Sequence, residues 1–304
     1  MGFVPAYLKV RAETFEESAE WLERVLADCT LCPRQCHVKR NAGEQGYCRT
    51  GQLPFVSSWG PHRGEERPLV GRGGSGTIFF SNCNLGCLYC QNYTISHLGE
   101  GAEISHERLA DIMLSLQEAG CHNINLVTPT HQVPGIVRSV KIASDKGLSL
   151  PLVYNCGGYE SLAAIALLDG IIDIYMPDFK YADPAAAERY SDAVDYPERA
   201  REAIREMHRQ VGDLVMDERG IATRGLLVRH LVLPEGLAGT EEVVEFIAAE
   251  ISPHTYLNVM DQYHPCDRAC EHPFLNRRIG VREYEDALAC ARRAGMTRID
   301  GVTI

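Results

Sequence analysis

Three cysteines lie close together in the segment SNCNLGCLYCQN, with the spacing Cys83-x3-Cys87-x2-Cys90. Three thiolates this near in sequence can reach one metal centre if the chain loops around it, and Asn84 and Gly86 are residue types that permit such a loop. Iron–sulfur clusters normally take four thiolates, so three ligands leave one iron of a [4Fe–4S] cluster open to another molecule.

The alternatives for this trio are three buried cysteines or a zinc site. Zinc would call for a fourth protein ligand close by, and the nearest histidine is His97. We therefore interpret Cys83, Cys87 and Cys90 as the ligands of a [4Fe–4S] cluster with one open coordination position.

A second group has the spacing Cys29-x2-Cys32-x3-Cys36-x11-Cys48. The sequence between these cysteines is rich in turn formers and lacks a core of its own, so a metal would supply its folding energy. Structural zinc sites commonly pair two CxxC units, and only one is present here. The Cys32-Pro33 pair is typical of ferredoxin-like runs. Zinc and an auxiliary [4Fe–4S] cluster both stay open, and the pattern leans to iron–sulfur.

The remaining five of the twelve cysteines are dispersed or paired near the end of the chain: Cys121, Cys156, Cys266, Cys270 and Cys290. The segment YHPCDRACEH brings His264, Cys266, Cys270 and His272 together, and these residues could bind metal by type. We interpret Cys266 and Cys270 as two nearby thiols in a loop.

Composition excludes several classes of protein. The 304 residues carry a formal net charge of −11, and no run of Lys or Arg provides the basic footprint of a nucleic-acid binder. No apolar stretch approaches the ~20 residues that span a bilayer, and the start lacks the apolar region of a signal peptide. We expect a cytoplasmic protein, where many cysteines indicate metal binding rather than disulfides.

The elements that position these cysteines alternate from about residue 76 onward. Short, continuously apolar runs predict strands buried on both faces. They are GTIFFSN, INLVTP, PLVYNC, IIDIYMPDF, LLVRHLVLP and TYLNVMDQ. Helical stretches separate them: HERLADIMLSLQEAG, VPGIVRSVKIASDKG, SLAAIALLDG, PERAREAIREMHRQVG and TEEVVEFIAAEIS, with VREYEDALACARRAG after the last strand.

Six β/α alternations predict an α/β fold with a parallel sheet, either a partial, curved (β/α)6 TIM-like barrel or a doubly wound sheet. In both, functional groups gather at the carboxyl ends of the strands. We expect residues 76–304 to form this barrel and residues 1–75 a small cysteine-rich extension. The extension should contain a helix over 13–28, with Thr14 as N-cap and Glu17 in capping-box position, and an irregular stretch over 49–75.

A CxxxCxxC motif at the end of the first barrel strand is similar to the signature of the radical S-adenosylmethionine (SAM) superfamily, and Tyr89 before the last cysteine also fits. As a set, CxLCPRxC, SGTIFFSNCNLGCLYCQN, NLVTPTH, YNCGGY, DIYMPDFKY, LLVRHLVLP and MDQYHP resemble the PflX branch of the pyruvate formate-lyase activating-enzyme-like proteins. The resemblance implies that SAM chelates the open iron. An electron from the cluster, supplied by a reductase or flavodoxin-like donor, then cleaves SAM to a 5′-deoxyadenosyl radical that takes a hydrogen atom from the substrate.

The resemblance also implies which residues bind SAM, all at strand ends. Thr128 and Thr130 replace the GGE-type motif that holds the SAM amino group in many relatives, and Asn155 and Cys156 stand where the activating enzyme has Asp and Thr. Met176, Asp178 and Lys180 match its M-x-D-x-K run, and Arg229 matches an arginine near SAM. Asn258 and the Tyr263-His264 pair fall where relatives contact adenosine. Asn155 in place of Asp removes a charge, which weakens the expectation of a cation site beside the SAM carboxylate.

Three functions stay open on this basis. The first is an activating enzyme that makes a glycyl radical on a partner protein. The second is a radical SAM enzyme acting on a small molecule or another macromolecule. The third is an iron–sulfur electron carrier. It is the weakest of the three, because an electron carrier would not need a barrel or a cluster with an open iron. A nucleic acid or membrane partner is not expected.

Overall fold

The computed structural model describes residues 3–300. Its sheet has the order β10-β9-β8-β6-β5-β4-β2-β1-β3, with β7 paired only to β8. The strands are β1 Phe55–His62, β2 Ser75–Phe80, β3 Ala102–Glu103, β4 Ile124–Val127, β5 Leu152–Cys156, β6 Ile174–Pro177, β7 Val215–Met216, β8 Ala222–Leu231, β9 Tyr256–Met260 and β10 Ile299–Asp300.

The six strands predicted from the apolar runs are confirmed as β2, β4, β5, β6, β8 and β9, which run parallel to one another. Strands β4, β5 and β6 are buried along their whole length, as continuous apolar sequence requires. The sheet does not close, because β3 and β10 stand at its two ends. The fold is therefore an α/β partial barrel, as predicted.

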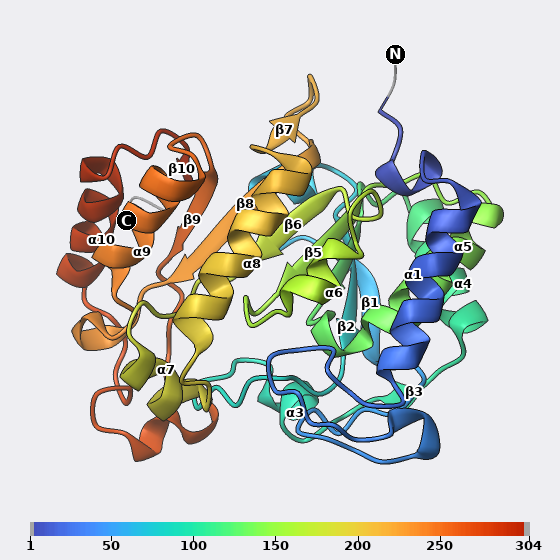
Figure 1. Cartoon of the computed structure of the whole chain (residues 1–304). Helices are drawn as coiled ribbons and strands as arrows, with labels where there is room; N and C mark the ends of the chain where they lie inside the picture. The colour runs from blue at the N-terminus through green and yellow to red at the C-terminus, as the bar shows by residue number, and fades with distance from the viewer. Residues whose placement is uncertain (1–2, 301–304) are drawn as a thin grey trace.

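Helices follow the strands and cover the sheet (Figure 1). They are α1 Ala12–Val25, α2 Arg67–Val70, α3 Tyr93–Ser96, α4 His106–Glu118, α5 Val133–Asp145, α6 Leu162–Ala166, α7 Pro184–Ser191, α8 Tyr196–Val211, α9 Thr240–Phe246 and α10 Val281–Arg293. Figure 1 shows α1, α4 and α5 beside the β1–β2 end of the sheet, and α9 and α10 beside β9 and β10. None of the helices in residues 3–300 is long and apolar enough to cross a lipid bilayer.

Two expectations for the N-terminal part are corrected. Residues 49–75 are not irregular throughout: β1 spans Phe55–His62 and pairs antiparallel with β2, which adds it to the barrel sheet. Its sequence hides this because Gly60 and Pro61 are poor strand formers. Both lie beyond Phe55 and Val56, the two residues of β1 that pair with β3. The helix α1 begins at Ala12, with Arg11 at the N-cap and no side-chain cap, so Thr14 lies inside the first turn. The proposed division at residue 75 stays a prediction.

Candidate active site

The three cysteines of the CxxxCxxC motif occupy the loop that follows β2, and all three line one cavity of about 510 Å³. Backbone and hydroxyl groups steady the sulfurs: Cys83 Sγ accepts from the Leu85 amide at 3.4 Å, and Cys87 Sγ accepts from the Ser191 hydroxyl at 3.0 Å. Cys90 Sγ lies 3.1 Å from Ser96 Oγ. The sequence-predicted trio is therefore brought together at the carboxyl end of the first barrel strand.

Burial sets the protonation of these thiols. It raises the pKa of Cys83 and of Cys90, with the neighbouring Cys87 adding to the effect, while Lys180 opposes it. Thiols of raised pKa become metal-binding thiolates only by losing their protons, so metal binding here is coupled to proton release.

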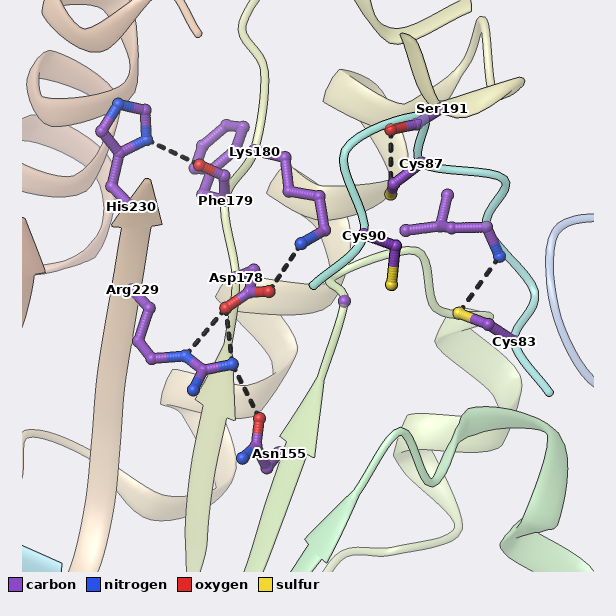
Figure 2. A network of polar contacts seen from close by, with 12 residues as sticks. Cys83, Cys87, Cys90, Asn155, Asp178, Phe179, Lys180, Ser191, Arg229 and His230 are labelled. Atoms are coloured by element: carbon purple, nitrogen blue, oxygen red, sulfur yellow. Dashed lines mark hydrogen bonds and ion pairs between the residues drawn. The ribbon is translucent and has the colours of Figure 1, made fainter. Parts of the chain in front are cut away.

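A charged network from three neighbouring strands faces the cysteine loop across the cavity (Figure 2). Asp178, after β6, accepts from Arg229 Nε at 2.8 Å and from Lys180 Nζ at 2.6 Å. Arg229, on β8, also donates from Nη2 to Asn155 Oδ1 of β5 at 2.8 Å. An isolated bridge pairs Asp178 with Arg229, so the backbone itself sets the two side chains next to each other.

The electrostatics of this network keep all three charges in place. Burial by itself would raise the pKa of Asp178, but Arg229 and Lys180 outweigh it and hold the pKa below its usual value. Burial opposes the charge of both cations as well, yet Asp178 raises the pKa of Lys180 and of Arg229 above their usual values. The cavity therefore keeps two cations fixed on one carboxylate within reach of the cysteine loop.

Comparison with known proteins identifies the family. The model of the radical SAM superfamily matches residues 77–247. The chain belongs to the radical SAM superfamily. It is also 31% identical, over 300 residues, to the uncharacterized protein MJ0674 of Methanocaldococcus jannaschii, covering 95% of this chain and 82% of that one.

Two solved structures resemble the radical SAM fold seen here more distantly. One is the FeFe-hydrogenase maturase HydG from Carboxydothermus hydrogenoformans, with 14% identity and a TM-score of 0.48, covering 72% of this chain and 50% of that chain. The other is native anSMEcpe with bound AdoMet, with 10% identity and a TM-score of 0.47, covering 72% and 61%. This chain thus spans between half and two thirds of their length.

Members of the radical SAM superfamily bind SAM and a [4Fe–4S] cluster, and the residues present fit that cluster. Cys83, Cys87 and Cys90 all line one cavity of about 510 Å³. Three thiolates around a shared space are the donor set that leaves one iron of a [4Fe–4S] cluster open.

The residues predicted to bind SAM divide into two groups. Those that line the cavity are Thr128, Asn155, Cys156, Asp178, Lys180, Arg229 and Asn258. Thr130 is buried elsewhere and donates to Glu160 Oε1 at 2.6 Å, Met176 is buried in a small core cluster, and His264 contacts Gln262 and Gln91 in a loop. These three lie outside the cavity lining.

Sequence reasoning missed the residues that line the cavity from the end of β1 and the segment after it. His62 ends β1, Glu65 and Glu66 follow it, and Glu66 accepts from Asn258 Nδ2 at 3.1 Å. The sequence feature that could have indicated them is the cluster of charged residues just before the first barrel strand. The prediction that residues 49–75 are irregular overlooked this cluster. Tyr89, noted for its place in the motif, is buried and accepts from the Tyr181 hydroxyl at 2.6 Å.

The four N-terminal cysteines surround a second, much smaller cavity of about 10 Å³. Cys29, Cys32 and Cys48 are buried and Cys36 is half-buried. Asn84 also lines this cavity, whereas its neighbours Cys83 and Leu85 line the larger one. The two sites therefore lie on opposite sides of one loop.

Proposed function

We propose that this protein cleaves SAM reductively and uses the product to take a hydrogen atom from a substrate. A [4Fe–4S] cluster held by Cys83, Cys87 and Cys90 would supply that chemistry, giving methionine and a 5′-deoxyadenosyl radical. The observation that carries the proposal is that the three cysteines and the Asp178–Lys180–Arg229 network line the same cavity.

The cations of the network are suited to hold the carboxylate of SAM. Lys180 and Arg229 are fixed by Asp178, so they lose little side-chain freedom when an anionic ligand arrives. The bond from Arg229 to Asn155 fixes the plane of the guanidinium. Asn258 and Thr128, elsewhere in the lining, are proposed to contact the adenosine and the amino group.

Buried aromatic side chains are proposed to keep water from the reacting atoms. Tyr89 stands in edge-on contact with Tyr181 and Tyr263, with ring centroids 6.4 and 5.8 Å away, and all three rings are buried. A reactive radical needs such a dry wall, because water and loose side chains would otherwise quench it.

For the substrate, we propose an activase that makes a glycyl radical on a partner protein, with a flavodoxin-like reductase as electron donor. The likeness of the motifs to the PflX branch supports the activase. A small molecule or another macromolecule as substrate is the alternative, and a glycyl-radical motif in a neighbouring gene would favour the activase.

The test is anaerobic reconstitution with iron and sulfide, followed by dithionite and SAM. The wild type should form 5′-deoxyadenosine, and Cys83→Ala, Cys87→Ala and Cys90→Ala should each abolish it by removing a ligand. Cys290→Ala is the matched control, because Cys290 lies on α10 away from the cavity. A fully reconstituted wild type that forms no 5′-deoxyadenosine with several reductants would refute the proposal.

We further propose that Cys29, Cys32, Cys36 and Cys48 hold a second metal centre. Three residues other than glycine in this segment, Gln35, His37 and Arg49, have left-handed backbone angles, with φ of 42°, 54° and 50°. Each such angle costs on the order of 1–3 kcal/mol and persists only where other contacts enforce it. A bound metal would provide that constraint.

The single CxxC unit and the Cys32-Pro33 pair favour a [4Fe–4S] cluster over zinc at this second site. A Cys83/Cys87/Cys90→Ala triple variant separates the options by elemental analysis. About four irons with sulfide would mean a cluster, and one zinc without sulfide a structural site. A folded, metal-free variant would rule out both.

A further inference from the structure

Two adjacent glutamates in the SAM cavity have no part in the function proposed above. Glu65 and Glu66 follow β1 and line the same cavity as Cys83, Cys87 and Cys90. Their side chains are only 9% and 5% exposed. Carboxylates this deeply buried are rare unless a cation or hydrogen-bond donors compensate them.

Only one of the two carboxylate oxygens of Glu66 has a hydrogen-bond partner among the described residues. Its Oε1 accepts from Asn258 Nδ2 at 3.1 Å and lies 3.7 Å from Arg229 Nη1. Its Oε2 is buried and has no hydrogen-bond partner among the described residues. A buried carboxylate oxygen without a donor is costly, so this atom marks a place where a ligand with a donor group would fit.

The charges around Glu66 do not balance either. Arg229 is the nearest cation to Glu66, but it is already bonded to Asp178 at 2.7 Å, and Lys180 is committed to Asp178 as well. Glu65 stands beside this group with His62 Nδ1 at 3.1 Å. Among the described residues that line the cavity, carboxylates outnumber permanent cations by five (Glu65, Glu66, Asp178, Asp261, Asp300) to three (Arg67, Lys180, Arg229).

SAM alone would not give Glu66 a charged hydrogen-bond donor in the pose proposed above. Its carboxylate would engage Lys180 and Arg229 and so withdraw positive charge from the glutamates, while its amino group would bind iron. Its sulfonium is a cation but has no N–H or O–H group to donate to the Oε2 of Glu66, and its ribose hydroxyls are neutral donors. A second ligand in the same cavity with a cationic N–H group would supply both the charge and the donor.

We propose that Glu65 and Glu66 bind an ammonium or guanidinium group of the substrate, next to SAM. This inference rests on the proposed function and adds the chemical class of the substrate: a cationic molecule, either a free amine or guanidine or the side chain of a Lys or Arg in a protein. Paired carboxylates suit both groups, because each can accept several N–H bonds from one cation.

The first experiment uses the reconstituted protein with SAM and pairs of probes that differ in charge but hardly in shape. Methylguanidine is compared with methylurea, butylamine with butanol, and N-acetyl-arginine amide with N-acetyl-citrulline amide, by anaerobic calorimetry. We expect at least one cation to bind at least tenfold more tightly than its neutral counterpart. Preference for the free cations indicates a small molecule, and binding of the arginine amide alone indicates a protein side chain. Equal affinity within all three pairs overturns the proposal.

The second experiment uses Glu65→Gln and Glu66→Gln, with Glu103→Gln on the exposed strand β3 as matched control. Each cavity variant should weaken cation binding about tenfold or more and leave SAM affinity within about threefold, whereas the control should change neither. Loss of SAM affinity with unchanged cation binding would assign the glutamates to SAM and overturn the proposal. If the wild type forms no 5′-deoxyadenosine, the proposed function fails; if it does and the cations behave as their neutral counterparts, only this inference fails.

Discussion

Asp178 compensates two buried cations at once, and its replacement by Asn removes the charge while keeping the shape. The Asn oxygen can still accept from Arg229, which bonds Oδ1 of Asp178 at 2.8 Å. The Asn amide group would then face the Lys180 ammonium, which now donates to Oδ2 at 2.6 Å. Two donors would confront each other, and Lys180 would lose its carboxylate.

The expected loss of stability in Asp178→Asn depends on which carboxylates remain near Arg229 and Lys180. Arg229 retains Glu66 at 3.7 Å, so it is not left alone. Lys180 forms no ion pair with a second carboxylate within residues 3–300. Breaking a buried pair by removing one partner costs roughly 3–5 kcal/mol. The Lys180 side chain is 16% exposed and can regain some hydration, so we expect about 3 kcal/mol.

Thermal unfolding of the anaerobic protein measures this cost. A loss of about 3 kcal/mol should lower the Tm by roughly 5–10 °C in a chain of this size. Asp183→Asn is the matched control, because Asp183 is the exposed N-cap of α7 and Asn caps equally well. Adding Lys180→Met to Asp178→Asn should recover most of the loss, since no buried ammonium then remains unpaired.

Two results would refute this reasoning about Asp178. One is a Tm for Asp178→Asn within about 1 °C of the wild type, which would mean that the network adds nothing to stability. The other is a double variant no more stable than Asp178→Asn, which would show that the loss does not come from the ammonium of Lys180.

Three further predictions concern neighbouring parts of the site. Arg229→Gln should weaken SAM binding tenfold to a hundredfold, because one charged contact worth about 1.5–3 kcal/mol is lost, and it should leave the cluster spectrum intact. The control is Arg224→Gln on the same strand, and equal SAM affinity in the two variants would contradict the prediction. Gly158→Ala should lower the Tm far more than Gly147→Ala, because both have positive φ but only at Gly158 would a Cβ meet a backbone carbonyl oxygen, at 2.2 Å. Burial raises the pKa of Glu160 from 4.5 to about 7, so the folded protein keeps the Glu160 carboxyl protonated to higher pH than the unfolded chain does. The free energy of unfolding should therefore fall by roughly 3 kcal/mol as the pH rises from about 4.5 to 7. Glu160→Gln should remove this decline, and a variant with the same pH profile of stability as the wild type would contradict the prediction.

The sequence by itself determined the framework of this protein. Six strands could be placed because each is continuously apolar, and burial on both faces leaves no other pattern for a parallel strand. The three cysteines proposed as cluster ligands could be grouped because their spacing is local: Cys83, Cys87 and Cys90 share one loop, so no long-range contact is needed to bring them together. Strand β1 was missed because Gly60 and Pro61 interrupt any apolar pattern along it.

Only the tertiary structure decided which polar side chains face one another. Asp178, Arg229 and Asn155 lie on three different strands, and their contact depends on the register of the sheet. Thr130 looked like its neighbour Thr128 in sequence, yet it turns to Glu160 and away from the cavity. Side-chain direction at a strand end depends on the local backbone, and Thr128 has a left-handed φ of 60° that no apolar pattern encodes.

The contact between Glu66 and Asn258 is the clearest case of this kind, because 192 residues separate the two in sequence. No local pattern reports a meeting of two segments so far apart. It arises because the segment before β2 crosses the carboxyl-end cavity that β9 also borders. Sequence spacing could group the three cysteines of the CxxxCxxC motif. The buried carboxylate oxygen of Glu66 without a hydrogen-bond partner among the described residues is a product of tertiary packing around the cavity.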